Sequence, residues 1–572
     1  MAEVIISPGV FQQETDQSFY NATPQVVGAA LVGPTVKGSP FVPTYVTNYN
    51  QFVTLYGDTF KSGSYYYEYF TSQAAKEYFA NGGRTILVTR IISGSADVDT
   101  YASSDVLDTV DGIAFTLETL AWGDLMNNAG GATSGALDNG TSQNVRWEVN
   151  YSDTGSGIFT ITVRRGDDTD AQKNVLETWT NLSLDPQLPN YISRVIGDIK
   201  PIPDVETGIV TLQGNFANKS AFVRVASVTN VMVDSLDNNG NFKTTEYGDL
   251  MPAIGSGSAD GAFDGGVADT DQPKQMYENI DGDNIQGFTP ADYINGFRML
   301  TDKDGVQFNV LLAPGITLDS TTATAANAMI STVENRGDAI AVIDSGFYGT
   351  TIAAAVANAG PFLSNYAATY FPWVSLYSTG LGKSIWCPPS TAIGGVLAYN
   401  DSVTAEWFAP AGLNRGGMPS VLTAERRVPQ TDRDTLYLGR VNPIATFPGI
   451  GVAVWGQKTL QKKPSSLDRI NVRRLLISLK GFIGGVARTL VFEQNTTSTR
   501  NRFLAQVNPY LSSVVQRQGL YAYKVIMDAT NNTPDVVDRN QLVGQIYIQP
   551  TKTAEFVILN FNILPTGATF PA

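Results

Sequence analysis

Two glycine-containing segments have spacings that could bind a phosphate group. Residues Gly28–Gly33 have the G-x-x-x-x-G spacing of a phosphate-binding loop, but Pro34 stands where that loop needs its lysine. Gly449 and Gly451 precede an apolar run, as in a dinucleotide-binding turn, but Val454 occupies the place of the third small residue. We therefore expect no nucleotide site at either segment, and we interpret the second as a turn before a buried strand.

Two acidic runs could offer oxygen ligands to a calcium ion. Asp281 and Asp283 form one run, and residues Asp237–Gly240 form the other. Neither run has the spacing and the closing glutamate of an EF-hand loop, so polar turns are the simpler interpretation. The sequence predicts no metal site.

The chain has 572 residues and contains no histidine. This excludes the Ser-His-Asp and Cys-His relays, histidine general bases and histidine-ligated zinc. The single cysteine, Cys387, cannot form an intrachain disulfide or a multi-thiolate metal site, which fits synthesis in a reducing compartment. The sequence therefore predicts a protein that is not an enzyme, with no catalytic residues and no cofactor.

The composition predicts several ordered domains. Hydrophobic residues make up 43% of the chain and charged residues 16%, which is enough to bury cores of roughly 150 residues each. The formal net charge of -15 argues against nucleic acid as a partner. The N-terminal residues have no basic segment followed by an apolar one, and no run of about 18 apolar residues occurs. We expect neither a signal peptide nor direct membrane insertion.

One segment is basic within this acidic chain. Residues 415–502 contain 15 Lys and Arg against 5 Asp and Glu, a balance of +10 that leaves -25 for the remainder. Such asymmetry suits docking onto an acidic partner or an acidic face of a neighbouring copy. The alternative, a solvated charged surface, has equal weight. The candidate contact residues are Arg469, Arg473, Arg474 and Lys480.

The composition and the hydrophobic pattern of the sequence change along the chain and predict five regions. We expect an N-terminal arm at 1–21, a first core part at 22–95, a β-rich inserted outer domain at 96–275, an α/β domain at 276–400, and a C-terminal core domain at 401–572 with a terminal strand arm at 553–564. In the insertion, alternating runs at Val145–Val149 and Phe159–Val163 predict strands. Gly, Asp and Ser dominate Gly255–Thr270, which predicts a loop or linker.

The region 276–400 predicts strands and helices in alternation. Residues 308–312 and 339–343 have the apolar character of buried strands, and residues 322–335 and 350–359 have helical character. This order implies parallel strands with crossover helices. The loop that follows Leu312 holds no catalytic side chains. The fold alone therefore does not indicate a catalytic activity.

Both ends of the chain predict extended segments, and the basic segment predicts helices. Helices are expected at 468–483 and 499–517. The apolar residues expected to form the strands of the terminal arms are Val4, Ile6, Val10, Val557, Leu559, Phe561 and Ile563. An arm of about 20 extended residues could span about 60 Å.

Nine stretches together resemble the contractile tail sheath family of myovirus-type bacteriophages and of phage-derived injection particles. They are SPGVF at 7–11, FANGGRTILVTRI at 79–91, LETWTNLSLD at 176–185, WCPPS at 386–390, FAPAGLNRG at 408–416, VWGQKTL at 454–460, INVRRLL at 470–476, DATNNTPDVVD at 528–538 and IYIQPTKTAEFVILNF at 546–561. The insertion matches least, apart from LETWTNLSLD and the Asp260-Gly261 loop.

The resemblance implies an α+β multidomain protein. Its conserved α/β core is built from N- and C-terminal parts, and the β-rich insertion projects outward. It also implies a structural subunit that polymerises as a helical sheath around a tail tube protein, next to baseplate and tail terminator proteins. The sheath would contract on a baseplate signal and drive the tube through the host envelope, as part of a virion assembled in the host cytoplasm. The terminal arms would pair with a sheet in adjacent subunits, and the basic segment would contact the tube or a neighbour.

Two other classes of protein remain as alternatives. Trp122, Trp147 and Trp179 in the insertion could bind sugar, as in a carbohydrate-binding or other virion surface protein, although core packing is the commoner role of tryptophan. A tube or capsid lattice protein is the second alternative, but a tube subunit would be a much shorter chain.

Overall fold

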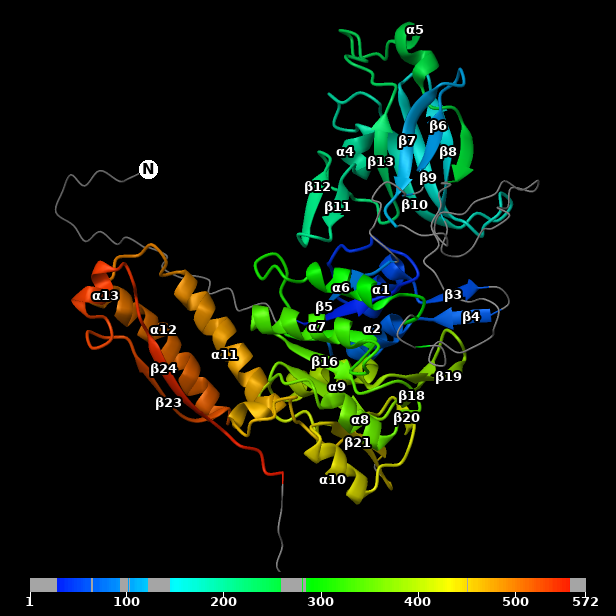
Figure 1. Cartoon of the computed structure of the whole chain (residues 1–572). Helices are drawn as coiled ribbons and strands as arrows, with labels where there is room; N and C mark the ends of the chain where they lie inside the picture. The colour runs from blue at the N-terminus through cyan, green and yellow to red at the C-terminus, as the bar shows by residue number, and fades with distance from the viewer. Residues whose placement is uncertain are drawn as a thin grey trace, which may run out of the picture.

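The computed structural model describes residues 28–555, with gaps at 63–64, 93–100, 102, 122–144, 259–279, 281–283 and 450. The described residues form three units (Figure 1). A central α/β unit holds the largest core, a β-rich unit stands on one side of it, and a unit of two long helices and a β-hairpin stands on the other. The expected multidomain α+β architecture is confirmed.

An eight-stranded sheet organises the central unit, in the order β2-β5-β1-β15-β16-β17-β21-β22. Strand β1 pairs in parallel with both β5 and β15, and β15, β16, β17 and β21 continue in parallel. The strands are β1 Ala29–Gly33, β2 Thr44–Val46, β5 Ile86–Arg90, β15 Val310–Thr317, β16 Ile340–Asp344, β17 Ala367–Phe371, β21 Asn442–Phe447 and β22 Gly451–Val454. One sheet therefore joins segments that the insertion separates in the sequence.

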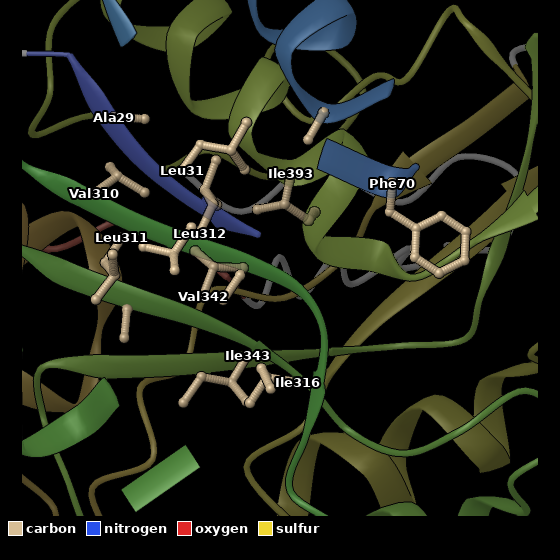
Figure 2. Packing of buried hydrophobic residues seen from close by; sticks show 14 of the residues in the cluster. Ala29, Leu31, Phe70, Val310, Leu311, Leu312, Ile316, Val342, Ile343 and Ile393 are labelled. Atoms are coloured by element: carbon tan, nitrogen blue, oxygen red, sulfur yellow. The ribbon is translucent and has the colours of Figure 1, made fainter. Parts of the chain in front are cut away.

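These strands are apolar on both faces because helices cover both sides of the sheet. Figure 2 shows Leu31, Leu312, Val342 and Ile393 packed together with Phe70 nearby. The predicted alternation of strands and helices in residues 308–359 is confirmed by β15, α7, β16 and α8. The helices are α1 Tyr49–Tyr56, α2 Phe70–Ala80, α6 Pro290–Arg298, α7 Ala323–Arg336, α8 Ile352–Ala359, α9 Pro389–Val403 and α10 Gln430–Leu438.

Helices α2 and α9 approach each other closely, and this ties the N-terminal segment to the middle of the chain. A β-carbon on Gly395 would lie 2.8 Å from the carbonyl oxygen of Glu77, so only glycine fits there. Small sheets complete the unit: β3 Thr59–Ser62 with β4 Tyr65–Glu68, and β18 Val374–Ser378 with β19 Lys383–Cys387 and β20 Val421–Ala424.

The β-rich unit is built from the predicted insertion and has its own core around Phe115, Val149 and Phe159. Its strands are β6 Ser103–Leu107, β7 Ile113–Thr119, β8 Val145–Asp153, β9 Ile158–Arg165, β10 Val175–Leu182, β11 Lys200–Asp204, β12 Ile209–Gln213, β13 Val223–Val228 and β14 Gly255–Ser258. Short helices are α4 Ile192–Ile196, α5 Thr244–Tyr247 and the 3-10 turn Gly248–Leu250.

The first part of the expected loop Gly255–Thr270 is instead the strand β14. Residues Gly255–Ser258 pair antiparallel with β8. Gly257 lies against Trp147, where a β-carbon would be 2.5 Å from the indole ring. Main-chain pairing and this close contact outweigh the low strand propensity of Gly and Ser, so the expectation of a loop was wrong for these residues.

The C-terminal unit consists of two long antiparallel helices and a β-hairpin packed on the second helix (Figure 1). Leu475, Phe503, Val507 and Leu511 lie in its core. The elements are α11 Ile470–Arg488, α12 Thr497–Gln516, β23 Leu520–Ile526, α13 Pro534–Asp538, β24 Gln545–Pro550 and the 3-10 turn Ser466–Asp468. Both predicted helices of the basic segment are confirmed, and each is a little longer than expected.

Candidate functional site

The segments predicted to pair with neighbouring subunits lie outside the described residues. They include all seven apolar residues proposed for the arms: Val4, Ile6, Val10, Val557, Leu559, Phe561 and Ile563. The described chain ends at Glu555, close to Arg469. The role of the arms therefore stays a prediction.

Arg474, one of the four candidate contact residues, is buried and paired within the chain. Its two terminal nitrogens donate to the two carboxylate oxygens of Asp401 at 2.8 and 2.5 Å, and its side chain is 2% exposed. Burial alone would lower the pKa of Arg474, but the Asp401 carboxylate overrides this and raises it. Arg474 thus fastens α11 to the end of α9.

Arg473 is also buried, on the same turn of α11. Its guanidinium donates to Asn365 Oδ1 at 2.8 Å and lies 4.0 Å from the ring centre of Tyr366. Burial lowers the pKa of Arg473 because no carboxylate compensates. A stacked guanidinium of this kind holds the helix against the loop before β17.

The two remaining candidates lie at the edges of the same contact. Arg469 binds Glu555 at 2.7 Å and Asp468 at 2.9 Å. The exposed Lys480 lies 3.4 Å from the hydroxyl of Tyr366. At the end of α11, Arg488 binds Asp304 at 3.0 Å. The basic side of α11 therefore docks the C-terminal unit onto the central unit, and contacts of these residues with a tube or neighbour stay a prediction.

A surface that the sequence reasoning missed lies at the turn between α11 and α12. Phe492 is fully exposed and has a left-handed backbone (φ 69°), and Val491 beside it is 59% exposed. A β-carbon at Gly481 or Gly485 of α11 would meet open space. Neither α11 nor α12 contains an acidic residue. This absence of Asp and Glu from residues 470–488 and 497–516 is the feature of the sequence that could have pointed to this surface. The result is an exposed apolar turn at the end of the C-terminal unit, next to Glu493, which pairs with Arg502 at 3.4 Å.

The segments that could have bound a phosphate or a metal have structural roles. Residues 29–33 are the buried strand β1 itself. Gly449 lies in the turn between β21 and β22, and Gly451 begins β22, both with positive φ. Asp237 Oδ1 accepts hydrogen bonds from the N–H groups of Asn239 and Asn241, both at 2.8 Å, as in an ordinary polar turn. Asp281 and Asp283 lie outside the described residues.

A search of the described residues for metal ligands and membrane spans is negative. Within them, no group of three or more Cys, Asp and Glu side chains is arranged to hold a metal ion. No described helix combines the length and apolar character needed to cross a bilayer.

A buried carboxylate lies at the carboxyl end of β16, where α/β folds often bind ligands. Asp344 accepts hydrogen bonds from the backbone N–H and the hydroxyl of Ser390, at 2.8 and 2.7 Å. Burial raises the pKa of Asp344 to about 7, although these hydrogen bonds oppose the shift. Its acceptors are used to anchor the start of α9, so the group has a structural role.

Two consecutive parts of the chain match models of one protein family. The model of the phage tail sheath protein central domain matches residues 286–460. The model of the phage tail sheath C-terminal domain matches residues 462–564. The two models therefore cover β15 to β22 of the central unit and the whole described C-terminal unit.

Curated relatives carry the same description. The tail sheath protein of Enterobacteria phage T4 is 32% identical over 301 residues, which are 49% of this chain and 46% of the relative. The tail sheath protein of Vibrio phage KVP40 is 38% identical over 188 residues, which are 33% of this chain and 28% of the relative. The chain thus spans less than half the length of these relatives.

Solved structures extend the likeness of fold to almost the whole chain. The contracted helical sheath of the anti-feeding prophage superposes with a TM-score of 0.50 at 16% identity, covering 98% of this chain and 99% of that one. A sheath tail protein from Listeria innocua gives 0.52 at 10% identity, covering 92% and 96%. Residues 286–564 therefore match, one after the other, the central and C-terminal domains of phage tail sheath proteins.

Proposed function

We propose that this chain is the subunit of a contractile tail sheath, which forms a helical cylinder around a tail tube and shortens to drive that tube through a host envelope. The observation that carries the proposal is the consecutive match of the central and C-terminal sheath domains over residues 286–564. Related particles have the matching assembly: the anti-feeding prophage structure is described as a helical sheath in its contracted state.

The architecture suits a subunit that must move as a rigid body. The central sheet takes strands from segments on both sides of the insertion, so the subunit cannot open without breaking its largest core. Movement during contraction would therefore occur at the connections between copies. Arms that donate a strand to a neighbouring sheet would keep copies joined by main-chain hydrogen bonds while their linkers bend. The seven apolar arm residues, Val4 to Ile563, are proposed for this pairing.

Contraction in this account needs no nucleotide and no active site. A difference of a few kcal/mol per subunit between two packings, summed over many copies, would supply the work. The sheath is placed in the virion tail, assembled in the host cytoplasm, with baseplate and tail terminator proteins at its two ends. The chain would act as a structural protein and not as an enzyme.

The exposed apolar turn at the end of the C-terminal unit is the surface we propose for the tube. It presents the exposed side chains of Phe492 and Val491, and the acid beside them, Glu493, is paired with Arg502 at 3.4 Å. Arg469 and Lys480 lie along the same unit at its contact with the central unit. Burial of Arg473 and Arg474 supports a role in holding the unit in place, so their effect on tube binding would be indirect.

Electron microscopy of the purified chain tests the proposal, with a variant lacking residues 1–20 in parallel. Striated hollow cylinders are expected from the full chain, alone or with the cognate tube, and their loss is expected on deletion of the arm. Monodisperse particles in the presence of the tube would contradict the sheath function. Phe492→Ser tests the tube surface: tube-dependent assembly should fall, while the exposed Leu363→Ser serves as the matched control.

A second function is not favoured by the tryptophans of the β-rich unit. Trp147 is 8% exposed, and its Nε1 donates to Ser104 at 2.9 Å. Trp179 packs against the core of this unit and donates to Glu177 at 3.1 Å. Both indole nitrogens are used within the chain, and Trp122 lies outside the described residues.

A further inference from the structure

The chain after β24 returns from the C-terminal unit to the central unit (Figure 1). We name residues 551–555 the strap. At its start, Thr551 donates through its N–H to the carbonyl oxygen of Gly519 at 3.2 Å and through its hydroxyl to that of Gln518 at 2.8 Å. Both acceptors lie in the turn between α12 and β23, so the first residue of the strap is fixed to the C-terminal unit.

The other end of the strap, Glu555, is bound by side chains from three separate segments. Arg469 directly precedes α11 and donates to both carboxylate oxygens, from Nε at 2.7 Å and from Nη2 at 2.9 Å. The hydroxyl of Tyr437, near the end of α10, donates to Oε2. Nε2 of Gln457, in the segment after β22, donates to Oε1 at 3.1 Å. Each carboxylate oxygen of Glu555 therefore accepts two hydrogen bonds, and we name this contact the latch.

The middle of the strap is also held, but its lysine is accessible. Nε2 of Gln457 donates to Thr553 Oγ1 at 2.6 Å. Gln457 is itself 3% exposed, and its carbonyl oxygen accepts from the N–H of Ile470 at 2.9 Å. In contrast, Lys552 and Ala554 are exposed. The strap is thus a short, partly exposed bridge between two units, fixed at both ends.

The surroundings of the latch favour an acidic side chain. Lys458 Nζ lies 3.9 Å from the ring centre of Tyr437, and the guanidinium of Arg469 lies 5.8 Å from the same ring. Asp468 pairs with Arg469 at 2.9 Å, which leaves a second positive charge for Glu555 to balance. Burial alone would raise the pKa of Glu555, but the hydrogen bonds of the latch override this and lower it. Glu555 is therefore held as a carboxylate by charge-assisted hydrogen bonds.

The latch is more accessible than the buried arginine that also joins the two units. The side chains of Arg469 and Glu555 are 24% and 19% exposed. Arg474, which binds Asp401 at the end of α9, is 2% exposed. If the latch opened, Arg474 would still hold α11 against the central unit. The strap can therefore detach from the central unit while the C-terminal unit stays in place.

We propose that the latch fixes the point at which the segment after Glu555 leaves the subunit, and that it can open. With the latch closed, this segment starts from the central unit. With the latch open, it starts from Thr551, four residues earlier, which adds up to roughly 13 Å of reach. In a sheath, the latch would set how much slack a connection between copies has. Only this last step rests on the proposed function.

Limited proteolysis of the full chain, before assembly, tests the latch. Trypsin cleaves after the exposed Lys552, and intact-mass analysis detects the loss of residues 553–572. Arg469→Gln leaves the sequence of the strap unchanged and should speed this cleavage several-fold, because the strap is then held firmly at one end only. Tyr437→Phe should give a smaller increase, because it removes a single donor.

The matched control is Arg502→Gln, which breaks the exposed pair with Glu493 at 3.4 Å in the same unit. A thermal melting curve of each variant checks that it is folded. In a chain that carries Glu555→Gln, Arg469→Gln should add little, since its partner is already gone. An increase of full size in that background, or the same increase in the control, would overturn the latch and leave the sheath function standing.

Electron microscopy with the cognate tube tests what the latch does for assembly. The yield of cylinders should fall several-fold for Glu555→Gln and stay at the parent level for Glu493→Gln, the control. Equal yields from the two variants would overturn the role of the latch in placing the segment after Glu555. Faster cleavage at Lys552 in Arg469→Gln, with no cylinders from the parent chain and the tube, would support the latch and count against the sheath function.

Discussion

The central unit and the β-rich unit hold their carboxyl groups in opposite ways. In the central unit, Asp344, Glu68 and Glu77 are buried against hydroxyl and amide groups without a bound cation, and burial raises the pKa of each. In the β-rich unit, Asp168 is buried against Arg164, and exposed acids such as Asp153 sit in turns that lower their pKa. Burial therefore disfavours the charged form of these acids in the central unit, whereas the buried acid of the β-rich unit has an arginine beside it.

This difference fits the two roles. In the central unit, hydroxyl and amide groups satisfy the buried acids through hydrogen bonds and no described cationic side chain is bound to them. An ionised carboxylate with an arginine holds a small β-unit together and leaves its surface acidic. The two units should therefore respond differently to loss of a partner and to pH, and substitutions in each unit test this difference.

The largest effect is expected from Arg164→Met in the β-rich unit. Arg164 is fully buried and binds Asp168 through two hydrogen bonds of 2.8 and 2.9 Å. Removing it leaves the buried Asp168 with only the longer contact to Arg146 at 3.5 Å. Breaking a buried ion pair of this kind should cost about 3–5 kcal/mol. Calorimetry of the full chain should show one transition shifted down while the transition of the central unit stays. Arg165→Met, at a half-exposed neighbour, is the control, and equal shifts would contradict the contrast.

A smaller effect is expected from Asp344→Asn, on the pH dependence of the free energy of unfolding. The folded-state pKa of Asp344 is raised to about 7, against about 3.9 for an unfolded aspartate. Its contribution to stability is therefore fully present below about pH 4 and is lost as the pH rises through about 7. The Asp344→Asn variant should flatten that slope by roughly 1–3 kcal/mol between pH 5 and pH 8. Urea unfolding at both pH values measures this, and an unchanged slope would show that Asp344 is ionised.

For Asp153 in the β-rich unit, stability should depend on pH in the opposite direction, and Asp153→Ala tests this. Hydrogen bonds from the Ser156 hydroxyl and the Gly155 N–H lower the pKa of Asp153. Its contribution is present above the unfolded pKa of about 4 and is lost as the pH falls through the folded value. The alanine variant should melt slightly lower at pH 6 and like the parent at pH 2. Asp153→Asn, which keeps an acceptor, should show a smaller loss at pH 6, and a loss that persists at pH 2 would refute the assignment.

The smallest effect is expected from Arg488→Ala, at the contact between the central and C-terminal units. Arg488 and Asp304 are both well exposed, at 69% and 80%. An exposed ion pair contributes about 0–1 kcal/mol and is screened by salt. Thermal melting in low and high salt should therefore show a small shift that disappears at high salt. A large, salt-independent loss would mean that this pair, and not Arg474 with Asp401, holds the C-terminal unit in place.

The sequence predicted where helices and strands lie better than it predicted which strands pair with each other. Residues 322–335 and 339–343 have clear helical and strand character, so their helix and strand were expected. The hydrophobic pattern of residues 29–33 does not indicate that this strand lies between β5 and β15. Pairing of strands across an insertion depends on how the whole core packs. Gly255–Ser258 has no strand propensity, and its pairing depends on Trp147.

The basic residues illustrate the same limit at the candidate site. Net charge in residues 415–502 was visible, but charge does not tell which element covers a side chain. Val472 and Leu475 flank Arg473 and Arg474, which was the available sign that both arginines lie on a buried face. The fully exposed Phe492 had no sequence signal of its own, since a phenylalanine after two apolar residues usually predicts core packing.

The proposed contraction requires that copies of one chain occupy two helical packings. Electron microscopy of tube-bound cylinders, with image reconstruction before and after release of the baseplate, measures this directly. We expect a long narrow cylinder that becomes short and wide with the same number of subunits, while the eight-stranded sheet keeps its strand order. A cylinder of fixed length, or shortening by loss of subunits, would contradict it.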